Sequence, residues 1–344
     1  MKRFGTSSVS PGKLCTHSNV LLLRHPNSAT FYATTGALKT LISADETFDG
    51  TWPFAPHFST TAGFKQHFVD EGPEDGEVLV LLHGQPTWGY LYRNMIPGLA
   101  TNYRVIVPDH MGFGKSATPQ DREYTLRSHV ENLECLIEEL GVKAVTFVGQ
   151  DWGGPMIGAY TARNPEKVQR IFLMNTVLGY GGGKSSGGKT PWFQWIDKHA
   201  SNGTLEGILG EMGSTVLSVM KIIGFQNSAG VTDTWIRAYS EPFPDRASCI
   251  GAINFPLDIH EGRFLSFVRE TLEQGDIAAL RSKPAMLVSG DKDFGIAKDH
   301  AVSDFKGLFP RAPIVSVEGV GHFCQEDIPD TLVALIDGFV QSNP

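Results

Sequence analysis

The feature that most constrains the fold is a series of short apolar runs separated by helical patterns. Continuous apolar runs of this length are typical of strands buried on both faces of a parallel sheet. Between two of them, residues 126–141 place leucine, isoleucine and valine on one helical stripe that closes at Gly141. The alternation predicts a doubly wound, mostly parallel α/β sheet. Four of the runs are "EVLVLLHG" (77–84), "RVIVPDH" (104–110), "AVTFVGQD" (144–151) and "QRIFLMNT" (169–176).

This alternation is interrupted once. Residues 177–280 are helical in pattern and rich in aromatic side chains, with no convincing strand. Strand patterns return in "PAMLVSGD" (284–291) and "PIVSVEGVGH" (313–322). We therefore expect a core made of residues 45–176 and 281–344, with residues 177–280 as a helical cap. Ligands of such sheets bind at the carboxyl ends of the strands, and the cap would roof that crevice.

The N-terminal part of the chain differs from the rest. Residues 1–44 contain five lysines and arginines, no acidic residue and many serines and threonines. That composition is compatible with a transit peptide, but an irregular N-terminal extension packed on the domain surface is the favoured interpretation. Beyond it, "FKQHFVDEG" (64–72) alternates with period two and predicts an edge hairpin strand.

Composition excludes several classes of function. A net charge of −8 argues against nucleic acid and anionic membrane surfaces as partners. No apolar stretch reaches the 18 residues that a membrane span needs. The 11 histidines form neither an H-x-x-x-H nor an H-E-x-x-H pair, so we expect no metal and no cofactor. The four scattered cysteines predict free thiols in a reducing compartment, and hence a cytoplasmic protein. They are Cys15, Cys135, Cys249 and Cys324.

"VGQDWGGP" (148–155) carries the clearest chemical signal. It matches the G-x-S-x-G nucleophile elbow, except that Asp151 occupies the place of the serine. An aspartate in a turn is most often a capping residue. Here it stands between two glycines after a buried strand, which favours a catalytic nucleophile.

Other reactive side chains follow neighbouring strands at the same edge of the sheet. The order nucleophile, acid, histidine along the chain is that of α/β-hydrolase triads. His83, Asp109 and the glycines of residues 111–116 are more readily explained by loop and turn geometry, and Cys324 by packing. The candidate site residues are Gln85, Asp151, Trp152, Asp293 (in competition with Asp291) and His322.

A carboxylate nucleophile suits a substrate whose electrophile is a saturated carbon with a leaving group. Attack by Asp151 leaves an ester that water can cleave at its carbonyl, whereas a serine would leave an ether. His322 would activate that water as a general base, while Asp293 orients the imidazole ring. The backbone N–H groups of Trp152 and Gln85 would stabilise the oxyanion.

The leaving group distinguishes an alkyl halide from an epoxide. An epoxide oxygen needs an acid, typically a tyrosine pair in the cap, whereas a halide needs N–H donors. The indole of Trp152 is only a donor, and the amide of Gln85 can supply a second N–H. Both flank Asp151, which favours a halide.

The chain resembles the haloalkane dehalogenases of the α/β-hydrolase superfamily over roughly residues 64–340. The resemblance implies an α/β-hydrolase fold with an inserted cap, a nucleophile at Asp151, a base at His322 and a halide donor at Trp152. The alternative family position for the acid is Asn175, which is not acidic, so the resemblance implies Asp293. It also implies a small apolar halogenated substrate, water as co-substrate and a possible homo-oligomer. The motifs are "HGQPTWGYLYR" (83–93), "GQDWGGP" (149–155), "YSEPFPD" (239–245), "NFP" (254–256), "GDKDF" (290–294) and "GVGHFCQED" (319–327).

Two positions depart from the family pattern. Gln85 stands where Asn or Glu is usual, and Ile208 falls near the place of a second tryptophan donor in one branch. The pattern is most similar to the Asp–His–Asp branch with an amide and a Trp, which also resembles β-lactone decarboxylases. Epoxide hydrolases share "DWGG" and remain an alternative.

Two readings from other classes compete with these. "GKSSGGKT" (183–190) fits the phosphate-binding pattern G-x-x-x-x-G-K-[ST], but six residues separate it from the preceding strand and Pro191 follows it. It is better explained as a hinge or entrance loop of the cap. A non-catalytic receptor that kept the fold is disfavoured because every triad residue is present.

Overall fold

The computed structural model describes residues 38–182, 186 and 188–344 of the chain. Its centre is a sheet of eight strands in the order β1-β2-β4-β3-β5-β6-β7-β8. The first two strands pair antiparallel, and every pair from β4 to β8 is parallel. The predicted mostly parallel sheet is therefore confirmed. The strands are β1 (His57–Ser59), β2 (Gln66–Glu71), β3 (Glu77–Leu82), β4 (Tyr103–Pro108), β5 (Val145–Gln150), β6 (Val168–Met174), β7 (Ala285–Lys292) and β8 (Ile314–Gly321).

The central strands are the ones that the apolar runs predicted. Every residue of β5 is buried, and so are the last four residues of β3. The prediction of an edge strand at residues 64–72 is wrong. β2 pairs with β4 on one side and with β1 on the other, so the edge is β1. A strand of three residues is too short for periodicity to reveal it.

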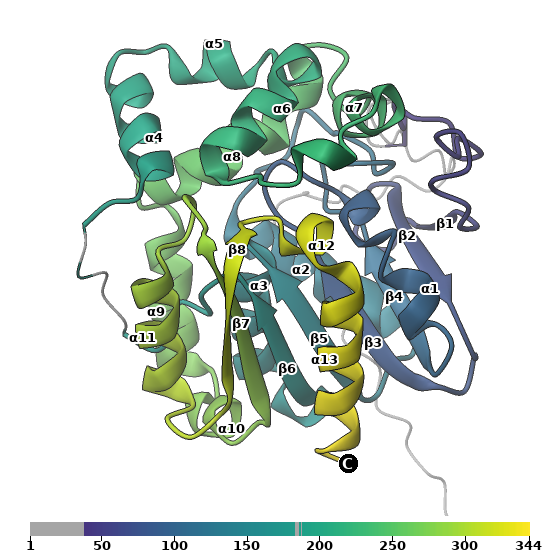
Figure 1. The fold of residues 1–344 in the computed structure, drawn as a ribbon, viewed down its shortest axis with the longest axis vertical. Helices are drawn as coiled ribbons and strands as arrows, with labels where there is room; N and C mark the ends of the chain where they lie inside the picture. The colour runs from purple at the N-terminus through teal and green to yellow at the C-terminus, as the bar shows by residue number, and fades with distance from the viewer. Residues whose placement is uncertain (1–37, 183–185, 187) are drawn as a thin grey trace, which may run out of the picture. The chain divides into compact units, whose positions relative to one another are not determined.

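Helices cover both faces of the sheet (Figure 1). α2 and α3 lie together on one face, and α13 lies with α1 on the other. The predicted helix at 126–141 is confirmed as α2, which begins with a capping box formed by Thr125 and Ser128 and ends before Gly141, where φ is +63°. The helices of this layer are η1 (Gly89–Tyr92), α1 (Ile96–Leu99), α2 (Leu126–Glu139), α3 (Gly153–Arg163), η2 (Pro165–Lys167), α11 (Lys298–Leu308), α12 (Cys324–Asp327) and α13 (Pro329–Gln341).

Among the described residues of the insertion between β6 and β7, the regular elements are all helices, and the first of them begins at Pro191. α4 to α8 lie over the carboxyl ends of the strands (Figure 1), whereas α9 and α10 pack against α3 on the face of the sheet. The roof over the site is thus built by the first five of these helices. The elements are α4 (Pro191–Ser201), α5 (Leu205–Leu209), α6 (Met212–Ile223), η3 (Ser228–Gly230), α7 (Asp233–Ser240), η4 (Ala247–Cys249), α8 (Ile250–His260), α9 (Phe264–Gln274) and α10 (Ile277–Arg281).

Most of the predicted N-terminal extension, residues 1–37, lies outside the described residues. Of the remainder, Ile42 is buried, and the carbonyl of Ala44 accepts a hydrogen bond from Lys115 Nζ at 2.8 Å. No helix among the described residues is long and apolar enough to cross a membrane.

The prediction of four free thiols is wrong for one cysteine. Cys135, on α2, is disulfide-bonded, whereas Cys249 and Cys324 are free and buried. Scattered cysteines carry no information about which of them the fold brings together. The inference of a reducing compartment therefore loses its support.

Candidate active site

Asp151 stands at the turn between β5 and α3. Its φ of +52° lies in the left-handed region, where a side chain other than glycine costs on the order of 1 kcal/mol. The following helix starts at once, and a Cβ atom on Gly153 would lie 2.5 Å from the carbonyl oxygen of Leu82. The small residues therefore let the turn close tightly, and the turn raises Asp151 at the carboxyl edge of the sheet.

The structure brings the three predicted triad residues together. His322 follows β8, with Nδ1 2.9 Å from Asp293 Oδ1 and Nε2 3.2 Å from Asp151 Oδ2. Asp293 Oδ1 also accepts hydrogen bonds from the backbone N–H groups of Gly295 and Ile296, each at 2.8 Å. These bonds hold the carboxylate toward the imidazole.

Asp291, the alternative candidate for the triad acid, bonds to a different part of the chain. Asp291 is exposed and accepts a hydrogen bond from the backbone N–H of Gly319 at 2.7 Å. Of the two aspartates in "GDKDF", Asp293 is therefore the one placed against His322.

The electrostatics of His322 are set by two opposing effects. Complete burial by itself lowers the pKa of an imidazole, but the charges of Asp293 and Asp151 outweigh it and raise the pKa of His322 to about 10. The contact of Nε2 with Asp151 is close in distance, yet it does not have the geometry of a hydrogen bond. We take it as an electrostatic contact that leaves Nε2 able to bond another group.

Asn175 supports the site in a way that the sequence did not reveal. Its Oδ1 accepts a hydrogen bond from Gly290 N at 2.8 Å, and its Nδ2 donates to the carbonyl of Gly321. These residues lie at the ends of β7 and β8. Sequence reasoning treated Asn175 only as a position that lacks an acid. Its φ of +46° is unusual for a residue other than glycine and accompanies these two hydrogen bonds. This backbone conformation is visible only in the structure.

Gln85 contacts the nucleophile through its backbone. The N–H of Gln85 donates to Asp151 Oδ1 at 2.7 Å. The side-chain Nε2 donates to the carbonyl of Ala252 at 2.9 Å, and Oε1 is buried without a hydrogen-bond partner. The amide is thus tied to the cap by one of its two N–H bonds.

Trp152 lies beside Asp151 and lines the same cavity. Its ring stacks on Phe255, with centroids 4.5 Å apart and planes inclined by 13°. Within the described part of the chain, its indole N–H makes no hydrogen bond. The predicted donor is therefore available to a ligand.

The cavity at this site is small, about 60 Å³ in volume. The core contributes polar groups to its wall, and the cap contributes apolar ones. Among the described residues no tyrosine lines it. Its lining is Gln85, Asp151, Trp152, Pro155, Thr176, Val177, Trp192, Phe193, Pro256, Ile259, Gly295 and Ile296.

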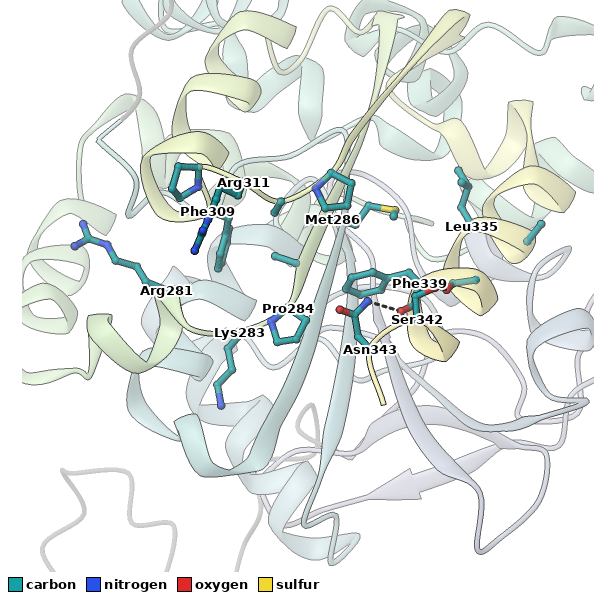
Figure 2. Close-up of a pocket in the computed structure, with 16 residues that line it drawn as sticks. Arg281, Lys283, Pro284, Met286, Phe309, Arg311, Leu335, Phe339, Ser342 and Asn343 are labelled. Carbon is teal, nitrogen blue, oxygen red and sulfur yellow. Dashed lines mark hydrogen bonds between the residues drawn. The ribbon is translucent and has the colours of Figure 1, made fainter.

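A larger cavity, of about 760 Å³, lies where β7 begins, at the opposite end of that strand (Figure 2). Arg281 and Lys283 border it on one side, and Phe339 of α13 and Asn343, which follows that helix, border it on the other. None of the predicted site residues lines it. Gln85, Asp151 and Trp152 line the smaller cavity instead, which is therefore the candidate active site.

His83 and Asp109, which the sequence analysis explained by loop and turn geometry, make hydrogen bonds to the backbone of nearby loops. His83 Nδ1 lies 3.2 Å from the carbonyl of Gly84, and its Nε2 accepts from the backbone N–H of His110 at 3.0 Å. Asp109 accepts hydrogen bonds from the backbone N–H groups of Gly89 and Lys115, each at 2.8 Å. These contacts hold the loops that carry Gln85.

The phosphate-loop pattern lacks its structural context. Residues 183–185 and 187 lie outside the described residues. Thr190 uses its hydroxyl to cap α4, whose first residue is Pro191, and the preceding strand ends at Met174. A phosphate loop needs a strand that leads directly into it. In the described ranges no group of three or more histidine, cysteine or acidic side chains could hold a metal ion.

Comparison with known proteins gives matches over most of the chain. The family model described as the alpha/beta hydrolase fold matches residues 77–329. A cis-3-alkyl-4-alkyloxetan-2-one decarboxylase from Shewanella oneidensis is 32% identical over 300 residues, which are 85% of this chain and 90% of that protein. A haloalkane dehalogenase from Psychrobacter cryohalolentis is 31% identical over 308 residues, 85% of this chain and 94% of that protein. The tetrameric haloalkane dehalogenase DpaA from Paraglaciecola agarilytica NO2 superposes with a TM-score of 0.66 at 27% identity, covering 83% of this chain and 92% of that chain.

Proposed function

The chain belongs to the alpha/beta hydrolase fold family, as a haloalkane dehalogenase-like member, and we propose that it hydrolyses haloalkanes through an ester on Asp151. The observation that carries the proposal is the grouping of an aspartate nucleophile, a histidine and a second aspartate beside an unpartnered indole N–H. The products are an alcohol, a halide ion and a proton.

In the first step a carboxylate oxygen of Asp151 attacks the carbon that bears the halogen. The new C–O bond forms as the carbon–halogen bond breaks, and the halide leaves with the bonding electron pair. The indole N–H of Trp152 and the second amide N–H of Gln85 receive the halide, which needs donors and takes no proton. The apolar cap wall keeps competing water away from this charge.

The second step uses His322 as the base. Ester formation removes the charge of Asp151, one of the two carboxylates that raise the pKa of His322. The pKa of the imidazole falls, so it can give up its proton and then accept one from water. The hydroxide adds to the ester carbonyl, and the backbone N–H of Gln85, 2.7 Å from Asp151 Oδ1 in the free enzyme, stabilises the oxyanion. On collapse the bond to the alkoxide breaks, and the alkoxide takes the proton of the imidazolium and leaves as the alcohol. The new carboxyl group of Asp151 then loses a proton, which restores the carboxylate.

One alternative has a specific observation in its favour. The relative from Shewanella oneidensis is a β-lactone decarboxylase, and it is 32% identical to this chain, against 31% for the dehalogenase from Psychrobacter cryohalolentis. Opening a β-lactone at its saturated carbon would use the same attack by Asp151, with a carboxylate in place of the halide. That leaving group also needs N–H donors. Epoxide opening is less well supported, because no tyrosine among the described residues lines the cavity.

The deciding experiment measures halide and proton release from 1-bromobutane and 1,2-dibromoethane, with a cis-dialkyl β-lactone and styrene oxide assayed in parallel. We expect equal amounts of bromide and protons, and a loss of at least about 10⁴-fold in Asp151→Asn. Olefin and carbon dioxide from the lactone, without bromide release, would assign the decarboxylase activity. Turnover of styrene oxide alone would mean that the argument from the leaving group is wrong.

A further inference from the structure

Helix α8 of the cap contains a proline. Pro256 stands in the seventh position of this helix of 11 residues. A proline has no backbone N–H, so the carbonyl four residues earlier has no helical donor. That carbonyl belongs to Ala252, which is fully buried. A buried carbonyl without a partner is destabilising, and another donor is needed.

Gln85 supplies that donor from the core. Its Nε2 lies 2.9 Å from the carbonyl oxygen of Ala252, and the Gln85 side chain is itself buried. We propose that Pro256 is a positioning residue for the proposed reaction: by withholding an N–H, it frees the Ala252 carbonyl to hold the Gln85 amide in its donor orientation.

The orientation matters because an amide has two different ends. Free rotation about its last bond would present either the carbonyl oxygen or the NH₂ group to a ligand. With one N–H held by Ala252, the other remains for a leaving anion, and the oxygen cannot take the place of the nitrogen without facing another carbonyl oxygen. A fixed donor stabilises developing charge without reorganisation.

The same helix also positions the second donor. Phe255, beside the proline, stacks on Trp152, and its other face packs on Phe113 with centroids 4.9 Å apart. Thus two adjacent residues of α8 hold both groups that would bind the leaving anion. This role of α8 rests on the proposed function, but the hydrogen bond between Gln85 and Ala252 can be tested without any turnover.

The first test is a double-mutant cycle on the melting temperature. In the native background, Gln85→Ala leaves the Ala252 carbonyl unpaired and lowers the melting temperature by several degrees, on the order of 4–8 °C. Pro256→Ala restores an N–H at residue 256. In that background we expect Gln85→Ala to lower the melting temperature by less than half as much. Pro256→Val restores the same N–H with a larger side chain and must show the same coupling.

A matched control separates the hydrogen bond from cavity volume. Ile259 lines the same cavity from the same helix, and its backbone N–H is not altered by substitution. Ile259→Ala should therefore be additive with Gln85→Ala. Additivity of both proline variants with Gln85→Ala, or equal coupling in the Ile259 control, overturns the inference.

The second test asks whether the bond positions the donor. Dissociation constants of chloride and iodide salts are measured by quenching of tryptophan fluorescence. We expect both proline variants to weaken chloride binding about fivefold more than Ile259→Ala does, and to affect iodide less. If the melting temperatures show coupling between Gln85 and Pro256, but both proline variants bind chloride as the native protein does, the positioning role is overturned. If the native protein binds no halide, the proposed function fails, and the cycle alone decides whether Pro256 frees the carbonyl for Gln85.

Discussion

The core and the cap contribute different kinds of group to one cavity. The three candidate catalytic side chains, Asp151, Asp293 and His322, all follow strands of the core. Each is held by backbone N–H groups or by another side chain of the core. The cap contributes an apolar wall, which includes Trp192 and Phe193, and one backbone carbonyl that holds Gln85. The candidate catalytic groups thus follow strands of the core, and the apolar wall of the cavity stands on a separate layer.

The two regions are nevertheless joined by a hydrogen bond from a cap tyrosine to a buried carboxylate of the core. Glu326, four residues after His322, forms a bidentate pair with Arg93 at 2.6 and 2.9 Å. Tyr239 of the cap helix α7 donates to the same carboxylate at 2.6 Å. Because the candidate catalytic side chains belong to the core and the apolar wall to the cap, we expect substitutions in the core to change the chemical steps. We expect substitutions in the cap wall to change which substrates fit the cavity, while the rate of the chemical steps changes little.

The largest effect is expected from the core. His322→Phe should complete one round of halide release and then stop, because the ester cannot be hydrolysed without a base. Steady-state turnover should fall by at least about 10³-fold. Rapid-quench measurement of one halide per protein, with a mass increase on the peptide that contains Asp151, would show the trapped ester. Continued turnover would remove His322 from the mechanism.

An intermediate effect is expected where core and cap meet. Gln85→Ala removes one donor for the leaving group, so cleavage should slow about tenfold for 1-chlorobutane and less for 1-iodobutane. Chloride is the poorer leaving group and depends more on donors. Rates are compared under single-turnover conditions, with Trp152→Phe as the matched loss of the other donor. Equal losses for chloride and iodide would show that Gln85 does not bind the halide.

A smaller effect is expected from the cap wall. Phe193→Ala enlarges the cavity, so we expect longer haloalkanes to gain relative to 1,2-dibromoethane, with kcat within about threefold of the native value. The control is Lys198→Ala, on the same helix α4 but exposed. If Phe193→Ala lowered kcat as much as a triad variant does, the cap wall would also contribute to the chemical steps, which would contradict the proposed division between core and cap.

The smallest effect concerns stability and pH. His322 has a pKa raised to about 10 in the folded protein, above the ordinary value of 6.5. Its stabilising contribution is fully present below the unfolded pKa of 6.5 and is lost as the pH rises through 10. Between these values the melting temperature should fall by about 3 °C more in the native protein than in His322→Gln. A steeper fall in the variant would contradict the sign of the shift.

Parts of this molecule were determined by local sequence. Four buried strands of the sheet and the helix α2 were predictable, because a continuous apolar run and a helical stripe are patterns within a dozen residues. The turn at Asp151 was predictable because only small neighbours permit so tight an elbow. The motifs also indicated the family, and the family model described as the alpha/beta hydrolase fold matches residues 77–329.

Other features needed the tertiary structure. Asp291 and Asp293 are two residues apart in one loop, and only the folded loop shows which of them faces His322. The orientation of the Gln85 amide depends on Ala252, which lies 167 residues away in the chain. The pairing state of Cys135 was missed for the same reason, whereas the edge strand β1 was missed because three residues are too few to show a pattern. Backbone preference and burial act over a few residues and can be read locally, whereas the partner of a buried polar group is set by how distant elements pack.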